Sequence, residues 1–154
     1  IPDAVRKWSK NQKIIIRNRK STRPWQHVFD ALYGYIKLAI KLDKDKSING
    51  ESFNFGPKNN KTFTVNDILK IIRNYWVKAK WVNQKKRTYK ETQTLNLKTN
   101  KAKKTLKWSC KISFEKNIFL LTRWYKNYYE NRKQIEKISL EQIRYYEKLI
   151  NIRK

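Results

Sequence analysis

The sequence predicts a mixed α/β chain, α+β-like when considered alone, in which helices alternate with several short strands. Apolar residues recur at helical spacing over long segments, most clearly over residues 28–42. The β-branched runs are short, as in the three isoleucines at 14–16. A complete doubly wound sheet needs several longer apolar strands, so the chain is expected to form none.

Spacing and capping residues place the individual elements. Residues 64–67 and 139–142 have the spacing of a capping box, and Ser113 is positioned to cap a long helix. The pattern predicts helices over 2–10, 28–42, 64–76, 100–106, 113–131 and from 139 onward. It predicts strands over 13–17, 51–55 and 80–82, and a polar, basic loop over 83–94.

The chain is strongly basic, with a formal net charge of +26 over 154 residues. One interpretation is a polyanionic partner such as RNA or DNA, with Trp76 and Trp81 as a stacking surface among lysines. The other is a solvated basic surface, because the lysines are spread along the whole chain and accompany many asparagines and isoleucines. We favour the solvated surface and do not expect nucleic acid as the partner. An aromatic content of 14% excludes a disordered basic tail.

Several other kinds of site are not expected. No run of about twenty apolar residues occurs, so no membrane span is predicted. A lone cysteine, Cys110, excludes an internal disulfide and fits a reducing compartment, so we expect a cytoplasmic protein. One histidine and one cysteine make no zinc site, and no glycine-rich phosphate loop is present. Tyr33 and Lys37 have a catalytic Tyr-x-x-x-Lys spacing, but we interpret them as a core tyrosine and a surface lysine.

A turn at residues 23–28, Arg-Pro-Trp-Gln-His-Val, links the first short strand to a helix. Pro24 fixes its own φ and favours an extended Arg23, whose planar fork suits a phosphate or a carboxylate. The alternative is an edge loop in which Trp25 fills the core and Arg23 is solvated. Asn54 precedes a Gly-Pro turn, where it is either a ligand-binding amide or the anchor of an Asx turn.

A set of motifs follows in a characteristic order along the chain. They are Ile-Pro-Asp at 1–3, the Arg-Pro-Trp-Gln-His-Val turn at 23–28, Phe-Asn-Phe-Gly-Pro at 53–57, Glu91, Leu-x-Leu at 95–97, Lys-Ala at 101–102, Leu-x-Trp at 106–108 and Trp-Tyr at 124–125. Together they resemble the carboxy-terminal half of the CDP-glucose 4,6-dehydratases, which are extended short-chain dehydrogenases/reductases. The resemblance covers essentially the whole chain.

The resemblance implies a binding role for this region. Residues 1–154 would bind the nucleotide sugar, whereas NAD would be bound mainly by a Rossmann domain upstream of residue 1. Arg23 would pair with the diphosphate, Asn54 would hydrogen-bond the same region, and Glu91 would contact the nucleotide. Gln26 and His27 would support Arg23 and the edge of the active site. No catalytic, cofactor-binding or metal-binding residue is expected in this chain.

We therefore expect the carboxy-terminal substrate-binding part of an extended short-chain dehydrogenase/reductase, without a complete Rossmann sheet. The whole enzyme would be an NAD-dependent lyase, a homodimer, that converts CDP-glucose to CDP-4-keto-6-deoxyglucose and water for polysaccharide biosynthesis. The absence of methionine and the Ile-Pro-Asp start predict a piece of a longer product, inactive alone. The alternatives are a basic nucleic-acid-binding module and an inactive truncated product.

Overall fold

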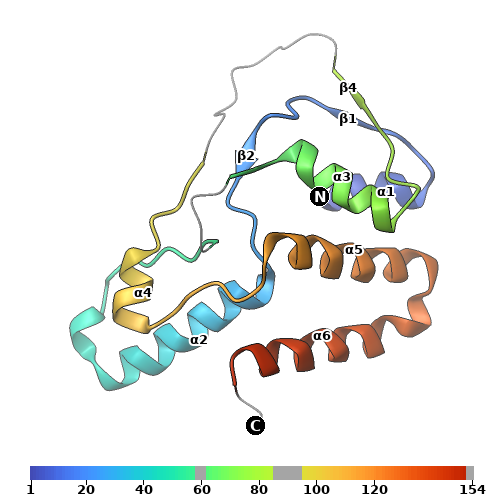
Figure 1. Cartoon of the computed structure of the whole chain (residues 1–154). Helices are drawn as coiled ribbons and strands as arrows, with labels where there is room; N and C mark the ends of the chain where they lie inside the picture. The colour runs from blue at the N-terminus through green and yellow to red at the C-terminus, as the bar shows by residue number, and fades with distance from the viewer. Residues whose placement is uncertain (58–61, 85–94, 152–154) are drawn as a thin grey trace.

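The computed structural model describes residues 1–57, 62–84 and 95–151 (Figure 1). Helices dominate these ranges, and the strands are two or three residues long. In chain order the elements are α1 (Pro2–Ser9), β1 (Ile14–Ile16), β2 (Thr22–Arg23), α2 (Val28–Lys44), the 3-10 turn η1 (Lys46–Ile48), β3 (Phe63–Thr64), α3 (Val65–Tyr75), β4 (Trp81–Asn83), α4 (Asn100–Leu106), α5 (Phe114–Glu130), the 3-10 turn η2 (Arg132–Gln134) and α6 (Ile135–Leu149).

The strands form two separate pairs in the described part of the chain. β1 lies parallel to β4, with Ile14 opposite Trp81. β2 lies antiparallel to β3, with Arg23 opposite Phe63. The prediction of a helix-rich chain without a complete sheet is therefore confirmed.

The largest part of the core lies where α1 and α3 pack on α5 (Figure 1). Trp8 and Trp76 are both 1% exposed, and their rings meet edge to face with centroids 6.2 Å apart. The indole N–H of Trp8 donates to the Lys80 carbonyl at 2.8 Å, which ties α1 to the segment that enters β4. Burial of such rings removes large apolar areas from water and anchors the amino-terminal strand.

Two helix starts agree with their sequence signals. Thr64 and Asp67 form a complete capping box at the start of α3, with both reciprocal hydrogen bonds present. The Ser113 hydroxyl accepts from the Lys116 backbone N–H at 3.2 Å and caps α5. These bonds satisfy backbone donors that would otherwise be unpaired at the helix ends.

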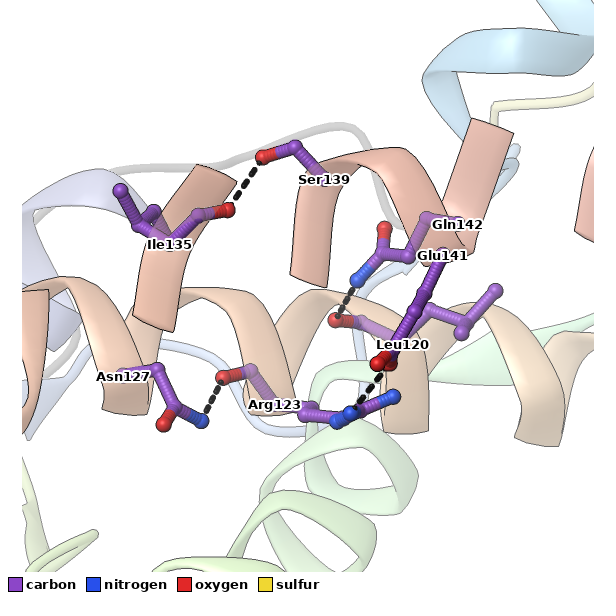
Figure 2. Close-up of polar contacts among 7 residues, drawn as sticks. All are labelled: Leu120, Arg123, Asn127, Ile135, Ser139, Glu141 and Gln142. Atoms are coloured by element: carbon purple, nitrogen blue, oxygen red, sulfur yellow. Dashed lines mark hydrogen bonds and ion pairs between the residues drawn. The ribbon is translucent and has the colours of Figure 1, made fainter. Parts of the chain in front are cut away.

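The predicted capping box at 139–142 is wrong, because α6 already begins at Ile135. Ser139 lies inside the helix, where its hydroxyl donates to the Ile135 carbonyl at 2.8 Å and accepts from the Trp124 indole at 3.0 Å. Figure 2 shows the polar contacts within and between α5 and α6. Gln142 donates to the Leu120 carbonyl at 3.0 Å, so a hydrogen bond between buried groups joins the two helices.

The predicted strand at 51–55 is also wrong, since this segment has no strand partner. The alternation of burial does occur, because Phe55 is 8% exposed whereas Asn54 is exposed. The Phe55 ring packs edge to face on Trp108 at 5.0 Å between centroids and lies against Gly34 of α2. A Cβ on Gly34 would lie 2.5 Å from that ring, so glycine is required for the close approach.

None of the described helices combines the length and the apolar character needed to cross a bilayer.

Candidate functional site

The Arg23 turn is held by backbone and side-chain hydrogen bonds on both sides. Arg23 lies on β2 and is half-buried, and its Nη1 donates to the Thr22 carbonyl at 2.7 Å. The Trp25 indole donates to the Phe63 carbonyl at 3.1 Å and packs against the main core. Because a proline, a strand pair and a packed indole fix the turn, the backbone that carries the Arg23 guanidinium is rigid.

Gln26 connects this turn to the 53–57 segment. Its side-chain N–H donates to the Phe55 carbonyl at 3.0 Å. Its side-chain oxygen is buried and has no hydrogen-bond partner in the described parts of the chain. The bond to Phe55 joins two segments that are far apart in the sequence.

His27 is buried at the start of α2, where it is 5% exposed. Its Nδ1 accepts from the Phe29 backbone N–H at 3.2 Å, so the ring caps the helix. Burial lowers the pKa of His27, and this effect outweighs the nearby Asp30 charge and the Gln142 hydrogen bond, which both raise the pKa. A buried, neutral imidazole that caps a helix supports the turn structurally and does not face open solvent.

A cavity of about 370 Å³ lies beside the turn, between β2–β3 and the start of α5. We call it the Arg23 cavity. Its lining combines two cations with aromatic and hydroxyl groups: Arg23, Trp25, Pro57, Phe63, Cys110, Lys111, Ile112, Ser113, Phe114 and Glu115. Guanidinium, ammonium and hydroxyl groups in one hollow suit an anionic ligand, and the single acid among these residues, Glu115, only partly offsets them.

The structure does not place Asn54 or Glu91 in the lining of the Arg23 cavity. Asn54 is exposed and immediately precedes Phe55, so it lies near the Gln26 bond but outside the lining of the Arg23 cavity. Glu91 lies outside the described residues. Among the predicted site residues that the structure describes, Arg23 is the one that lines this cavity.

Trp76 does not fit the stacking surface that the basic-module interpretation requires. It is 1% exposed, and its indole donates to the Glu130 carboxylate at 3.0 Å. Trp81 is half-buried, with the Arg73 guanidinium 5.7 Å from its ring. A ring that fills the core cannot stack a base, so this part of the alternative is wrong.

Sequence reasoning missed Asp30, which is fully buried on α2. Its carboxylate accepts hydrogen bonds from four groups. They are the Tyr146 hydroxyl at 2.9 Å, the Cys110 thiol at 3.0 Å and the backbone N–H groups of Lys111 and Ile112 at 2.7 and 3.3 Å. Its own backbone carbonyl accepts from the Trp108 indole at 2.9 Å.

We call these residues the Asp30 cluster. Burial and the adjacent Asp30 charge raise the pKa of the Tyr146 hydroxyl, which therefore stays protonated as a donor. The only local signal for Asp30 was an acid in the first turn of a helix, which the helix dipole alone explains.

One side of α2 is apolar and exposed. Its residues Val28, Leu32, Ile36 and Ile40 are 59%, 46%, 57% and 54% exposed, and we call them the outer face of α2. Three of these residues, Leu32, Ile36 and Ile40, line a cavity of about 650 Å³ between α2, α4 and α6. Lys37 on this side is half-buried, donates to the Leu106 carbonyl at 3.2 Å and lies 5.4 Å from the Tyr33 ring.

The chain resembles known proteins in both sequence and structure, although no family model matches it. It is 34% identical over 127 residues to CDP-glucose 4,6-dehydratase of Salmonella typhimurium, covering 82% of this chain and 35% of that enzyme. Its fold is that of the carboxy-terminal part of an extended short-chain dehydrogenase/reductase. The recognised resemblance to the CDP-glucose 4,6-dehydratases is thus confirmed.

Solved structures agree on this fold. An epimerase from Methanothermobacter thermautotrophicus is 22% identical, with a TM-score of 0.67 over 88% of this chain and 38% of that one. The UDP-glucuronic acid 4-epimerase from Bacillus cereus, solved with UDP-glucuronic acid and NAD, is 20% identical, with a TM-score of 0.67 over 81% of this chain and 38% of that one. The chain therefore spans little more than a third of the length of the relatives it matches.

Proposed function

We propose that this chain is the nucleotide-sugar-binding region of an NAD-dependent nucleotide-sugar 4,6-dehydratase. Its relatives are nucleotide-sugar dehydratases and epimerases. The similarity to the Salmonella typhimurium enzyme favours CDP-glucose as the substrate, with CDP-4-keto-6-deoxyglucose and water as the products. The homodimer and the cytoplasmic location belong to the same proposal, and the buried lone Cys110 supports a reducing compartment.

The observation that carries the proposal is the Arg23 cavity. Arg23 projects from a turn fixed by the Trp25–Phe63 bond and lines a hollow with a second cation. A volume of about 370 Å³ suits a diphosphate and part of a sugar or nucleoside more than a whole nucleotide sugar. The remaining contacts would come from Asn54, Glu91 and the rest of the enzyme. In this proposal Gln26 and His27 hold the turn.

NAD would be bound by a separate amino-terminal domain, because hydride transfer needs the cofactor beside the sugar. The outer face of α2 supports this, since four exposed aliphatic side chains form one unpartnered stripe in the described chain. Most of each relative's length lies outside the match, which leaves room for such a domain. We propose that this domain covers the outer face. The chain alone would position the substrate without catalysing the reaction.

A titration of the chain with CDP-glucose tests whether Arg23 binds the diphosphate of the ligand, a contact that we call the clamp. The Arg23→Ala variant should bind more weakly by about 1.5–3 kcal/mol, the usual contribution of a hydrogen bond to a charged group. Arg144→Ala is the matched control, because Arg144 is exposed on α6 and outside the cavity lining. Equal affinities of the Arg23→Ala variant and the unaltered chain would refute the clamp.

The domain proposal has its own test. The coding sequence upstream of Ile1 is read, and the intact mass of the native protein is measured. An in-frame segment with a glycine-rich strand–turn–helix and a Tyr-x-x-x-Lys helix would support the dehydratase, and the assembled protein should then form a 4-keto sugar nucleotide. An assembled protein that binds no NAD would refute it.

A further inference from the structure

Lys111 lines the Arg23 cavity from a segment far from Arg23 in the sequence. It lies between the end of α4 and the start of α5, whereas Arg23 lies on β2. Its side chain is exposed and forms no ion pair with any described residue. Two cations from separate elements therefore share one hollow.

The orientation of Lys111 follows from the burial of its neighbours. Cys110 and Ile112 are 8% and 6% exposed, so their side chains point into the core. Lys111, between these two buried residues, is exposed and lines the cavity wall. Ser113, the next residue but one, caps α5 and fixes the far end of the segment.

The Asp30 carboxylate accepts hydrogen bonds from residues 110–112, the segment that carries Lys111. The N–H of Lys111 donates to one carboxylate oxygen at 2.7 Å, and the N–H of Ile112 donates to the other at 3.3 Å. The Cys110 thiol donates to the carboxylate at 3.0 Å. Because three consecutive residues bond to one buried carboxylate, the Lys111 Cα is fixed relative to α2, and hence relative to the turn that carries Arg23.

We propose that Lys111 is the second cation that binds the ligand's diphosphate in the Arg23 cavity, and that Asp30 is the positioning residue that fixes it there. This inference rests on the proposed function, because it names a further contact in the same substrate site. It assigns Asp30 no contact with the ligand. Its carboxylate bonds to backbone and buried side chains, and Asp30 is absent from the cavity lining.

Titrations with CDP-glucose and cytidine at low salt test the Lys111 contact. Lys111→Ala should weaken CDP-glucose binding by about fivefold, as for one exposed ion contact. Lys111→Arg should restore most of this loss. Lys103→Ala, which removes an exposed lysine of α4 outside the cavity, should change nothing. Cytidine has no phosphate, so its affinity should be the same for all variants.

The outcomes separate the two proposals. If Arg23→Ala weakens binding and Lys111→Ala does not, Lys111 is not a ligand contact and the proposed function stands. If neither variant weakens binding, the clamp itself is refuted. An equal loss of affinity for cytidine would show that Lys111 acts through the fold and would overturn the inference.

A mutant cycle and hydrogen exchange test the positioning role. In an Asp30→Asn background, Lys111→Ala should cost clearly less than fivefold, because the lysine is no longer fixed. The same factor in both backgrounds would refute positioning by Asp30. In the unaltered chain the amide hydrogens of Lys111 and Ile112 should exchange slowly. This measurement decides the question if Asp30→Asn does not fold, since rapid exchange of the Lys111 amide contradicts the bond to Asp30.

Discussion

The two faces of α2 differ in burial, and in the opposite sense to their polarity. The inner face buries Asp30 and Gly34, whereas the outer face leaves Leu32 and Ile36 about half exposed. Asp30 finds four donors within the chain, but the aliphatic side chains of the outer face meet no equivalent partner in its described part. Burial in this helix therefore follows the availability of partners more than polarity. The inner face is complete by itself, and the outer face supports the proposed domain contact.

Removing the Asp30 carboxylate should have the largest effect on stability. Asp30→Ala leaves the Tyr146 hydroxyl and the amides of Lys111 and Ile112 without their acceptor. The expected loss in free energy of unfolding is about 3–5 kcal/mol, measured by urea denaturation. Asp43→Ala is the control, because Asp43 is exposed on the same helix, and it should change stability by less than about 0.5 kcal/mol. A similar loss of stability in both variants would show that the hydrogen bonds of Asp30 do not make the inner face of α2 more sensitive than an exposed position.

The Gly34→Ala variant tests how closely the inner face is packed. The new Cβ would lie 2.5 Å from the Phe55 ring, which is itself held against Trp108. Overpacking should outweigh the gain of about 1 kcal/mol in helix propensity and leave a net loss of about 1–2 kcal/mol. Adding Phe55→Leu should recover part of the loss in thermal unfolding. A stabilised Gly34→Ala variant would show that the inner face has spare room.

Ile36→Lys on the outer face should have the smallest effect. Because Ile36 is 57% exposed, the stability of the isolated chain should change by less than about 0.5 kcal/mol. Its self-association, measured by sedimentation, should decrease as the apolar stripe is interrupted. Ile72→Lys is the buried counterpart, 1% exposed, and should unfold the chain. A loss above about 1 kcal/mol for Ile36→Lys would show that the chain covers its own outer face.

Local signals explain which elements the sequence could predict. The capping box at Thr64 and Asp67 and the Ser113 cap act within three residues, so short motifs reveal them. Ser139 has the same local pattern but bonds backward to Ile135, because the 3-10 turn η2 starts the helix earlier. A short motif specifies a helix start only when no earlier start is available.

The candidate site depended on longer-range information. The Arg23 turn was visible because proline and a planar cation are local features, and the structure adds the cavity beside it. Lys111 and Asp30 were not visible, since one lysine among many carries no signal and the Asp30 donors lie 80–116 residues away. Similarly, the alternating phenylalanines reflect tertiary packing instead of strand pairing: Phe55 packs against Gly34, and Phe53 packs on the cluster that contains Phe55 and Trp108.

The long distance in sequence between Asp30 and its hydrogen-bond donors constrains how the protein folds during its synthesis. α2 leaves the ribosome long before the thiol, the amides and finally the Tyr146 hydroxyl that bond to Asp30, the last of them 116 residues later. Until then the carboxylate keeps its hydration shell, because a charge without partners is too costly to bury. Closing such a long loop is slow compared with forming a helix. The inner face of α2 is therefore sealed only after Tyr146 has left the ribosome.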